Sequence, residues 1–410
     1  MPKPLQGVRV ADFSHVMAGP FASHFLCLLG AEVIKIEAPG KGDAMRNYGA
    51  DRRYDGMAPA FIAANAGKKS IALDLKSPQG VEAAKRLIAQ SDVVLENFRP
   101  GVMARLGLGY EACKQLRPNI VFCSVSGYGQ SGPLRDYPAI DNIVQATSGM
   151  MSLGGEPGGP PMRVGFPAID TWTGQTGAVA ILAALLQRER FGEGQFIDLA
   201  MLDASLVFMA SAAVPYLVTG KTMERTGNTG YSGLPTAAMF STRDGSHISL
   251  GVVQDNQYAS LCRSLGRADL ITDGRFATSD LRRQNAAQLT AILEGIFISR
   301  TGIEWETLLS GNSVPCGLVR NLPDVFAQLP HLQDRGLLFS VPIPQLPDRQ
   351  EAQVLGAGFM FEHDGPEVHT APPRLGEHTD EILSALGYTA AELENMRQSG
   401  IFGSPTAQCA

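Results

Sequence analysis

The chain has 410 residues, of which 44% are hydrophobic and 18% are charged, and its formal net charge is −6. This composition is typical of a globular protein of about two domains, and it excludes collagen-like and low-complexity classes. No dense run of Lys and Arg occurs, so we expect neither nucleic acid nor a membrane surface as a partner. The apolar stretch 174–186 is too short to span a bilayer.

Cysteine usage and the first residues bear on the compartment. None of the six cysteines forms a CxxC pair, and no two of them have metal-ligand spacing with a histidine. We therefore expect free thiols in a reducing compartment and no metal site. The start MPKPLQGVRV lacks the apolar core of a signal peptide, which predicts a cytoplasmic protein.

Strand-like and helix-like segments alternate through the first third of the chain. The pattern predicts buried strands at 8–14, 32–38, 70–76, 92–98 and 119–129, and helices at 21–31, 78–91, 102–107 and 110–118. Such alternation requires right-handed crossovers and a parallel sheet that is covered on both faces. The fold class predicted here is α/β, with a Rossmann-like large domain.

The pattern changes after a helical stretch around 202–217. Asp244-Gly245 lies between apolar segments and predicts a hairpin, and three helices follow at 256–266, 286–300 and 303–311. We expect a smaller α+β domain at 225–330. The large domain would comprise 1–200 together with 335–410, with linkers at 201–224 and 331–370 and two more helices at 376–387 and 389–400.

Asp170 precedes a run that is apolar on every face from Gly177 to Leu186, which predicts a buried helix. Asp is a strong N-cap residue, so a capping role is the simplest interpretation. The small polar turn Thr171–Gly174 favours another one, in which the carboxylate lies between core and cleft and the helix amides keep it ionised. A charged, poorly hydrated carboxylate suits covalent catalysis on an activated acyl group.

The first strand-to-helix turn, DFSHVMAGPFASH, has small residues but no GxGxxG, so a nicotinamide site is not expected. No GxxxxGK[ST] phosphate loop exists either. His15 in this turn is either a hydrogen-bonded structural residue or part of the site. A ligand can approach the backbone from Val16 to Pro20.

The segment ENFRPGVMARLGLGY follows a strand, at the sheet edge where α/β proteins bind ligands. Asn97 offers a donor and an acceptor, Phe98 can stack, and Arg99 and Arg105 can reach phosphates. A strand end followed by a surface helix is the plainer interpretation. A second set of cations at this edge would add a diffuse anion site: Arg46, Lys68, Lys69 and Lys76.

Together these stretches resemble the class III CoA-transferases, the family of formyl-CoA transferase and carnitine CoA-transferase. The segments that carry the resemblance are 5–23, 29–43, 68–80, 91–108, 119–133, 164–190, 192–204, 225–230, 314–326 and 372–383. As a set they cover the chain to about residue 385.

The resemblance implies that Asp170 is the nucleophile, which forms a mixed anhydride with the acyl group and then an aspartyl-CoA thioester. It implies no permanently bound cofactor, with coenzyme A as substrate, and an interlocked homodimer. It also implies which residues hold CoA: Val16, Met17, Leu73, Lys76, Asn97, Phe98, Arg105 and Leu106. For the acceptor we expect His15, Asp141, Gln254 and Arg225 nearby.

Three departures from formyl-CoA transferase bear on the substrate. Met17 stands where that enzyme has glutamine, Ala38 stands where it has arginine, and GVVQDNQ at 251–257 stands where it has a glycine-rich loop. The resemblance therefore disfavours formyl-CoA and oxalate. A less polar turn favours a C4–C5 dicarboxylate such as succinate, mesaconate, itaconate or citramalate.

Two other functions stay open at this point. An α-methylacyl-CoA racemase resembles the same fold, but it needs an opposed histidine and aspartate, and the stretch YPAIDNIVQA carries Asp141 without a histidine. A non-catalytic CoA-binding protein would not need Asp170.

Overall fold

The computed structural model describes residues 2–49, 51–344 and 346–403. The chain forms two compact units: the first comprises 1–150, 164–220 and 331–410, and the second comprises 151–163 and 221–330. Most of the expected large domain lies in the first unit, but residues 151–163 belong to the second unit, which also contains the expected small domain. The helical stretch after residue 200, expected as a linker, belongs to the first unit.

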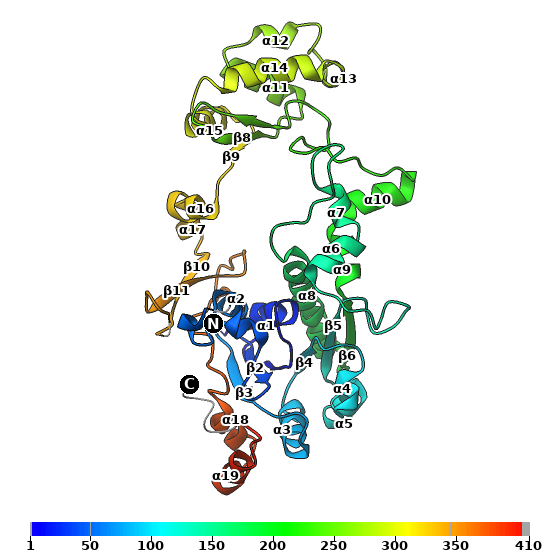
Figure 1. Ribbon diagram of the computed structural model, residues 1–410, viewed down its shortest axis with the longest axis vertical. Helices are drawn as coiled ribbons and strands as arrows, with labels where there is room; N and C mark the ends of the chain where they lie inside the picture. The colour runs from blue at the N-terminus through cyan, green and yellow to red at the C-terminus, as the bar shows by residue number, and fades with distance from the viewer. Residues whose placement is uncertain (1, 50, 345, 404–410) are drawn as a thin grey trace. The chain divides into compact units, whose positions relative to one another are not determined.

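The first unit is built on a six-stranded sheet in the order β3-β2-β1-β4-β5-β6. Its strands are β1 (Arg9–Asp12), β2 (Glu32–Glu37), β3 (Lys69–Ala72), β4 (Val93–Glu96), β5 (Val121–Ser126) and β6 (Gln195–Ala200). All neighbours are parallel, which confirms the predicted α/β class (Figure 1). The strand order reverses direction between β1 and β4, and ligands of such sheets bind beyond the carboxyl ends of the strands at this point.

Helices of the first unit cover both faces of the sheet, as predicted. They are α1 (Ala18–Leu28), α2 (Pro59–Asn65), α3 (Pro78–Ala89), α4 (Val102–Arg105), α5 (Tyr110–Leu116), α6 (Asp141–Thr147), α8 (Ala168–Phe191), α9 (Met201–Phe208), α10 (Ala210–Thr219), α17 (His331–Asp334), α18 (Thr379–Ala385) and α19 (Ala390–Gln398), with 3-10 turns at Ala44–Asn47 and Arg52–Tyr54. One buried cluster joins the sheet to α3, α5, α18 and α19, and the other joins it to α1, α8 and α9.

The helix α8 differs from its prediction, because only one side of it is buried in this chain. Gly177, Ala178 and Ile181 are buried, whereas Val179 is 66% exposed and Leu186 is 48% exposed. The helix covers the sheet with one face and turns an equally apolar face outward. The expectation of a helix buried all round is therefore wrong for the single chain.

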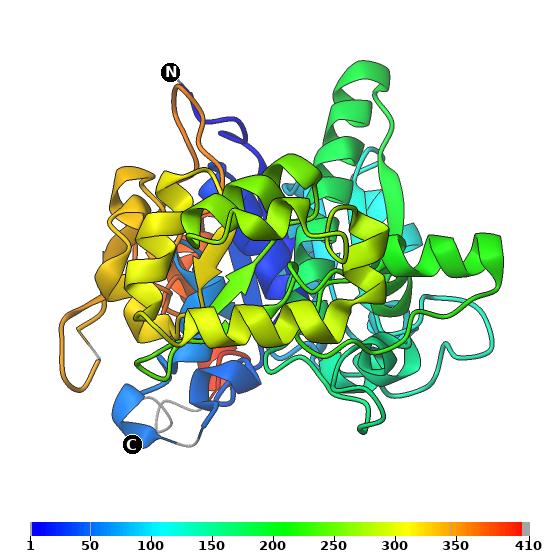
Figure 2. The same ribbon diagram turned by 90° about the horizontal axis from the view of Figure 1, so that it is seen from above.

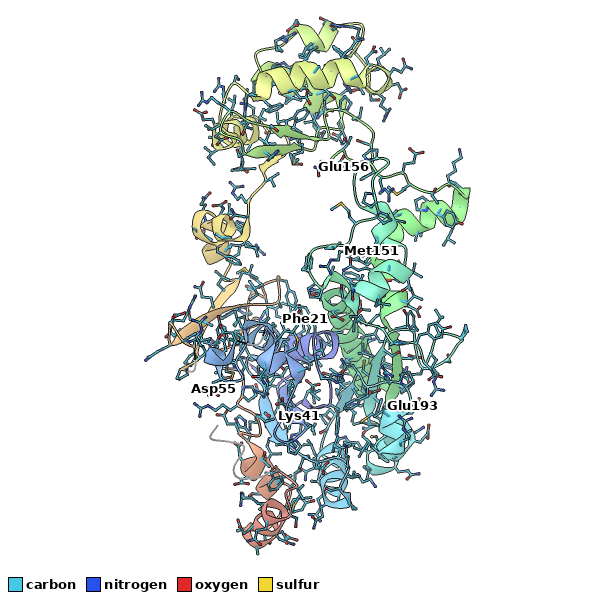
Figure 3. All side chains as sticks on the ribbon, viewed as in Figure 1. Phe21, Lys41, Asp55, Met151, Glu156 and Glu193 are labelled. Atoms are coloured by element: carbon cyan, nitrogen blue, oxygen red, sulfur yellow. The ribbon has the colours of Figure 1, made fainter. Side chains whose placement is uncertain are left out.

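Close packing joins α8 to α1 near the first turn of each helix. A Cβ atom at Gly174 would lie 2.8 Å from the Ala18 carbonyl oxygen and 3.0 Å from Cβ of Phe21. Phe21 is labelled on α1 in Figure 3. Because no side chain fits there, the two helices approach closely and fix the start of α8 against the sheet.

The Pro-rich strip near 341–350, expected as part of a linker, forms a hairpin instead. The strands β10 (Leu338–Pro342) and β11 (Glu351–Leu355) pair antiparallel. Val341 and Ile343 are fully buried and join a cluster with Met45 and Phe61. The apolar side chains of Val341 and Ile343 therefore pack this hairpin against the rest of the first unit.

The second unit contains a small antiparallel sheet of β7 (Met239–Ser241), β8 (His247–Leu250) and β9 (Cys316–Leu318). The hairpin predicted at Asp244-Gly245 joins β7 to β8. The helices of this unit are α11 (Asp255–Ser264), α12 (Asp269–Thr272), α13 (Ser279–Gln284), α14 (Ala286–Phe297), α15 (Gly302–Gly311) and α16 (Leu322–Gln328). Helix α7 (Met150–Leu153) lies at the boundary of the two units. Figure 2 shows the yellow-green helices of this unit in front of its short strands. The ring of Phe297 packs against the rings of Phe240 and Trp305.

Within the described ranges, no single helix has the length and apolar character needed to cross a membrane. The pair α9 and α10 meets the same criteria together, with a bend of 82° between the two helices.

Candidate active site

Asp170 lies in the first turn of α8, but it is not the N-cap of that helix. Pro167 occupies the N-cap position, and its side chain makes no capping bond. Asp141 takes this role from α6: its Oδ2 accepts the amide hydrogens of Ile169 at 2.7 Å and of Asp170 at 3.1 Å. The simple capping interpretation of Asp170 is therefore wrong, and its own carboxylate stays available.

A buried glutamine holds Asp141 in this position. Nε2 of Gln145 donates to Oδ1 of Asp141 at 2.6 Å, and Oε1 of Gln145 accepts the amide hydrogen of Val164 at 2.9 Å. Gln145 is only 1% exposed. The Asp141 carboxylate thus has three donors from the protein, and this favours a positioning role over the acceptor contact that we predicted for it.

The carboxyl group of Asp170 is partly buried and has no ion-pair partner within the described residues. Burial, and then the negative charge of Asp141, raise the pKa of Asp170 from its ordinary value of 3.8 to about 7. The helix amides were expected to keep this group fully ionised. They do not, because burial of the carboxyl group opposes its ionisation, and the like charge of Asp141, which accepts the amide hydrogens of Ile169 and Asp170, adds to this effect.

The turn after β1 is held against the end of β4 by two hydrogen bonds. The amide hydrogen of His15 is donated to Oδ1 of Asn97 at 2.8 Å, and Nδ2 of Asn97 donates to the carbonyl of His15 at 2.7 Å. The rings of His15 and Phe98 lie 5.3 Å apart. The structure therefore brings the predicted site residues His15, Asn97 and Phe98 together at the switch point. Both hydrogen bonds to Asn97 come from the backbone of His15 and not from its ring.

Val16 has a left-handed backbone conformation, with φ +68°. This region is unfavourable for β-branched residues, so the conformation needs external support. Asp43 supplies it by accepting the Val16 amide hydrogen at 3.1 Å. Val16 is 38% exposed, so the strained residue faces solvent in the expected ligand-binding turn.

Gly19 explains how α1 can start so close to this turn. A Cβ atom at Gly19 would lie 2.3 Å from Cβ of Ser14 and 3.5 Å from Cγ of Asn97. Any larger residue would push the helix away from the strand end. The Ala-Gly-Pro sequence therefore sets the distance between α1 and the residues of the switch point.

A buried ionic network lies beneath the turn. Nζ of Lys68 contacts Oδ2 of Asp12 at 3.2 Å, and Nζ of Lys35 contacts Oδ2 of Asp43 at 2.9 Å. Lys35 also donates to the Ser14 carbonyl at 2.7 Å. Because these groups are almost inaccessible to water, the bonds fix the turn at a defined position.

This network corrects the diffuse anion site that the sequence suggested. Lys68 is buried against Asp12, and the guanidinium of Arg46 is buried against Glu37 at 2.5 Å. Lys69 lies between Glu32 and Glu381. Of that set only Lys76 is exposed without a carboxylate partner in the described part of the chain.

The remaining residues expected to bind CoA differ in accessibility. Arg105 is exposed at the end of α4, and Leu106 and Phe98 are partly buried against the core. Leu73 is 1% exposed and belongs to the core, so only its backbone is left for a ligand. Met17 precedes α1 as its N-cap residue.

A cavity of about 630 Å³ lies beside the ends of β2 and β3. Lys41 and Asp55, labelled in Figure 3, are among the residues that line it, together with Arg374 and Arg397. Its lining combines cationic and acidic side chains. Asp170 is not among its lining residues, so this cavity is not the site of that carboxyl group.

Two residues expected near the acceptor belong to the second unit. Gln254 is the N-cap of α11, and its amide hydrogen is donated to Oε1 of Gln257 at 3.0 Å. Arg225 donates to the carbonyl of Gly159 at 2.5 Å. The expected loop 251–257 is half helical, since α11 begins at Asp255. The acceptor roles of these residues stay predictions.

The sequence analysis missed Asp43 and Gln145, which support the turn and the Asp141 cap. Asp43 ends a Gly-Lys-Gly turn and accepts the amide of Met45, so its capping position was a readable signal. Gln145 lies one helical turn after Asp141, a spacing that places both side chains on one face of α6.

Comparison with known proteins adds an independent finding. The model of CoA-transferase family III matches residues 5–379. Succinyl-CoA:glutarate CoA-transferase of Mus musculus is 37% identical, over 97% of this chain and 90% of that protein. Succinyl-CoA–D-citramalate CoA-transferase of Chloroflexus aurantiacus is 35% identical over 96% of each chain. A crystal structure of a CAIB/BAIF family protein from Brucella suis covers 94% of this chain and 100% of its own, with 34% identity and a TM-score of 0.83.

Proposed function

Because the chain belongs to CoA-transferase family III and is a CoA-transferase acting on small acids, we propose that it transfers CoA between dicarboxylates through covalent intermediates on Asp170. The observation that carries the mechanism is the state of this side chain. Asp170 lies in the first turn of α8, at the carboxyl edge of a parallel sheet. Its carboxylate is partly desolvated and has no cation beside it in the described residues. Such a group is a stronger nucleophile than a hydrated carboxylate.

The proposed cycle has four acyl-transfer steps. The Asp170 carboxylate attacks the thioester carbonyl of the donor, so that a mixed anhydride forms and CoA thiolate leaves. The thiolate then attacks the aspartyl carbonyl, which gives an aspartyl-CoA thioester and releases the donor's carboxylate. The acceptor carboxylate attacks this thioester, and the thiolate released by that step attacks the acceptor's carbonyl in the new anhydride. The products are the new acyl-CoA and free Asp170, and no net proton is consumed.

The dicarboxylate assignment rests on two lines of support. Met17 makes the turn after β1 less polar than the glutamine of formyl-CoA transferase would. The relatives from Mus musculus and Chloroflexus aurantiacus are named for succinyl-CoA as donor and for glutarate or citramalate as acceptor. We propose the same class here: a C4 donor and a C4–C5 acceptor.

For CoA itself, we propose contacts from Val16, Met17, Asn97, Phe98, Arg105 and Leu106, with Leu73 contributing its backbone and Lys76 its exposed ammonium group. The turn carrying Val16 and the strand end carrying Asn97 are fixed to each other by the two hydrogen bonds described above. CoA is a substrate in this scheme and not a resident cofactor.

Mass spectrometry of the intact protein tests the mechanism. After incubation with succinyl-CoA alone, we expect a CoA adduct that maps to Asp170, and hydroxylamine should inactivate the enzyme only when donor is present. The Asp170→Asn variant should bind CoA normally and lose exchange between succinate and glutarate. Turnover retained by this variant, or deuterium exchange at the α-carbon without any adduct, would overturn the proposal, and the second result would indicate a racemase.

We also propose that the enzyme is a homodimer. Helix α10 has no buried residue, and Tyr216, Leu217 and Val218 are each at least half exposed. A contiguous apolar surface of this kind is typical of an interface. Light scattering at micromolar concentration should give twice the chain mass of 43.7 kDa, and a monomer would contradict this assignment.

The thiols support a cytoplasmic location, which we propose as well. The cysteines in the described ranges are free, and Cys113, Cys123 and Cys262 among them are buried. Proteins of oxidising compartments use cysteines mainly in disulfides. Fractionation of cells that express a tagged full-length chain tests this location.

A further inference from the structure

Two guanidinium groups flank Gly101, which lies between the end of β4 and the start of α4. A Cβ atom built on Gly101 would lie 3.3 Å from Nη1 of Arg105 and 3.5 Å from Nη2 of Arg135. Because both distances start from one point, the two groups are within about 7 Å of each other. Gly101 also has φ +80°, so both its conformation and its surroundings call for glycine.

This pair of like charges has no compensating carboxylate within the described residues. Nε of Arg135 is moreover buried without a hydrogen-bond partner there. Three other arginines have a buried, unpartnered Nε: Arg117, Arg282 and Arg320. Each of those binds a carboxylate through its Nη atoms, namely Asp92, Asp255 and Glu306. Arg135 is thus distinguished by lacking an anion altogether, and a buried unsatisfied donor indicates a missing acceptor.

The segment that carries Arg135 is held in place at both ends. The amide hydrogen of Gln130 is donated to the carboxylate of Asp198 on β6 at 3.0 Å, and that of Gly129 to Oγ of Ser126 at 2.9 Å. At its other end the segment reaches Asp141, which caps the helix of the nucleophile. Arg135 is therefore positioned between the ends of β4 and β5, on the same loop that orients Asp170.

We propose that Arg135 and Arg105 together bind a phosphate group of CoA. The inference rests on the proposed function, because it takes CoA as the ligand, and it adds a residue that neither the sequence nor the comparisons assign. Guanidinium groups suit the task, since each can donate two parallel hydrogen bonds to phosphate oxygens. A phosphate between them would compensate both charges and supply the acceptor that Arg135 lacks.

Titration calorimetry with free CoA tests the pair. We expect Arg135→Ala to weaken CoA binding about tenfold or more. Arg135→Lys should recover only part of that loss, because lysine keeps the charge but cannot donate two parallel hydrogen bonds to one phosphate. The dependence of log Kd on log salt should also become shallower in Arg135→Ala. Comparing CoA with 3′-dephospho-CoA identifies the phosphate: if the penalty of Arg135→Ala disappears with the latter ligand, the 3′-phosphate is bound, and if it persists, the diphosphate is bound.

Arg190→Ala is the matched control, because this exposed arginine lies near the far end of α8, about 30 Å along the helix from Asp170. It should bind CoA as the unaltered enzyme does, and melting temperatures should show that all variants are folded. Unchanged CoA affinity in folded Arg135→Ala would overturn the proposal while leaving the transferase mechanism intact. The opposite outcome can be told apart from this one. If no CoA adduct forms on Asp170 but Arg135→Ala still binds CoA more weakly, the covalent mechanism is wrong and the phosphate site is retained.

Discussion

The acid limb of the enzyme's pH profile should depend on Asp141. In the proposed mechanism Asp170 must be ionised to attack the thioester, and its pKa is raised from 3.8 to about 7 by burial and by the charge of Asp141. Replacing Asp141 with asparagine removes the charge and keeps an oxygen that can accept the amide hydrogens of Ile169 and Asp170. The substitution therefore separates the electrostatic effect from the capping effect.

The size of the effect follows from the same shift. The pKa of Asp170 rises by about three units in total. Because burial is the larger cause, the charge of Asp141 accounts for less than half of this rise. We expect Asp141→Asn to lower the apparent pKa of Asp170 by about one unit. At pH 6 the ionised fraction would rise from about 9% to about 50%, a gain of about fivefold in kcat/KM, whereas at pH 8 the two enzymes would be nearly equal.

Initial rates of CoA exchange between pH 5.5 and 8.5 give the measurement. Asp136→Asn is the control, because it makes the same change at an exposed position of the same loop and should leave the acid limb in place. Asp141→Ala should behave differently again, since it leaves the first amides of α8 without an acceptor and costs about 1 kcal/mol of stability. An acid limb that stays at pH 7 in folded Asp141→Asn would refute the electrostatic part of the reasoning.

Three more outcomes follow from the structure. Burial raises the pKa of Glu96 from 4.5 to about 7, so between these pH values the folded state holds a proton that the unfolded chain releases. As the pH rises through this window, the wild type should lose up to about 3 kcal/mol of stability relative to Glu96→Gln, as measured by urea denaturation. Gly19→Ala should lower the melting temperature by several degrees, because its Cβ would lie 2.3 Å from Ser14, and an unchanged value would mean that α1 shifts freely. Arg105→Ala should raise the KM for acyl-CoA about tenfold with little change in the KM for the acceptor; the reverse pattern would show that the nucleotide lies elsewhere.

The periodicity of the sequence predicted most of the sheet and failed at its edge. Five strands are mostly buried, and each contains Val, Ile or Leu in a short segment between turn signals. The sixth, Gln195–Ala200, is mostly exposed and carries a charge at Asp198, so its residues resemble a loop. The strands β10 and β11 were missed because several prolines surround Val341 and Ile343, whose burial depends on partners far away in the chain.

Asp170 could be singled out from the sequence as a candidate nucleophile, but its electrostatic surroundings could not be predicted. Asp170 was identified by its position before an apolar helix and by its resemblance to a known family. The cap provided by Asp141 depends on a contact across about thirty residues, and the burial of Lys68 and Lys35 depends on strands that meet only in the folded sheet. Residue type alone suggested that Lys68 belongs to an accessible anion site, and it gave no sign that Lys35 is buried, since lysine usually lies at the surface.

The strained turn at Val16 has a consequence for how fast substrates exchange. Asp43 accepts the amide hydrogen of Val16, Asn97 accepts that of His15, and these bonds within the protein hold the turn in its unfavourable conformation. In the proposed function, the surface that receives CoA is thus organised before the nucleotide arrives, and little chain entropy has to be lost on contact. In a reaction that releases one acyl-CoA and captures another in each cycle, such rigidity lets both events proceed without refolding of the loop.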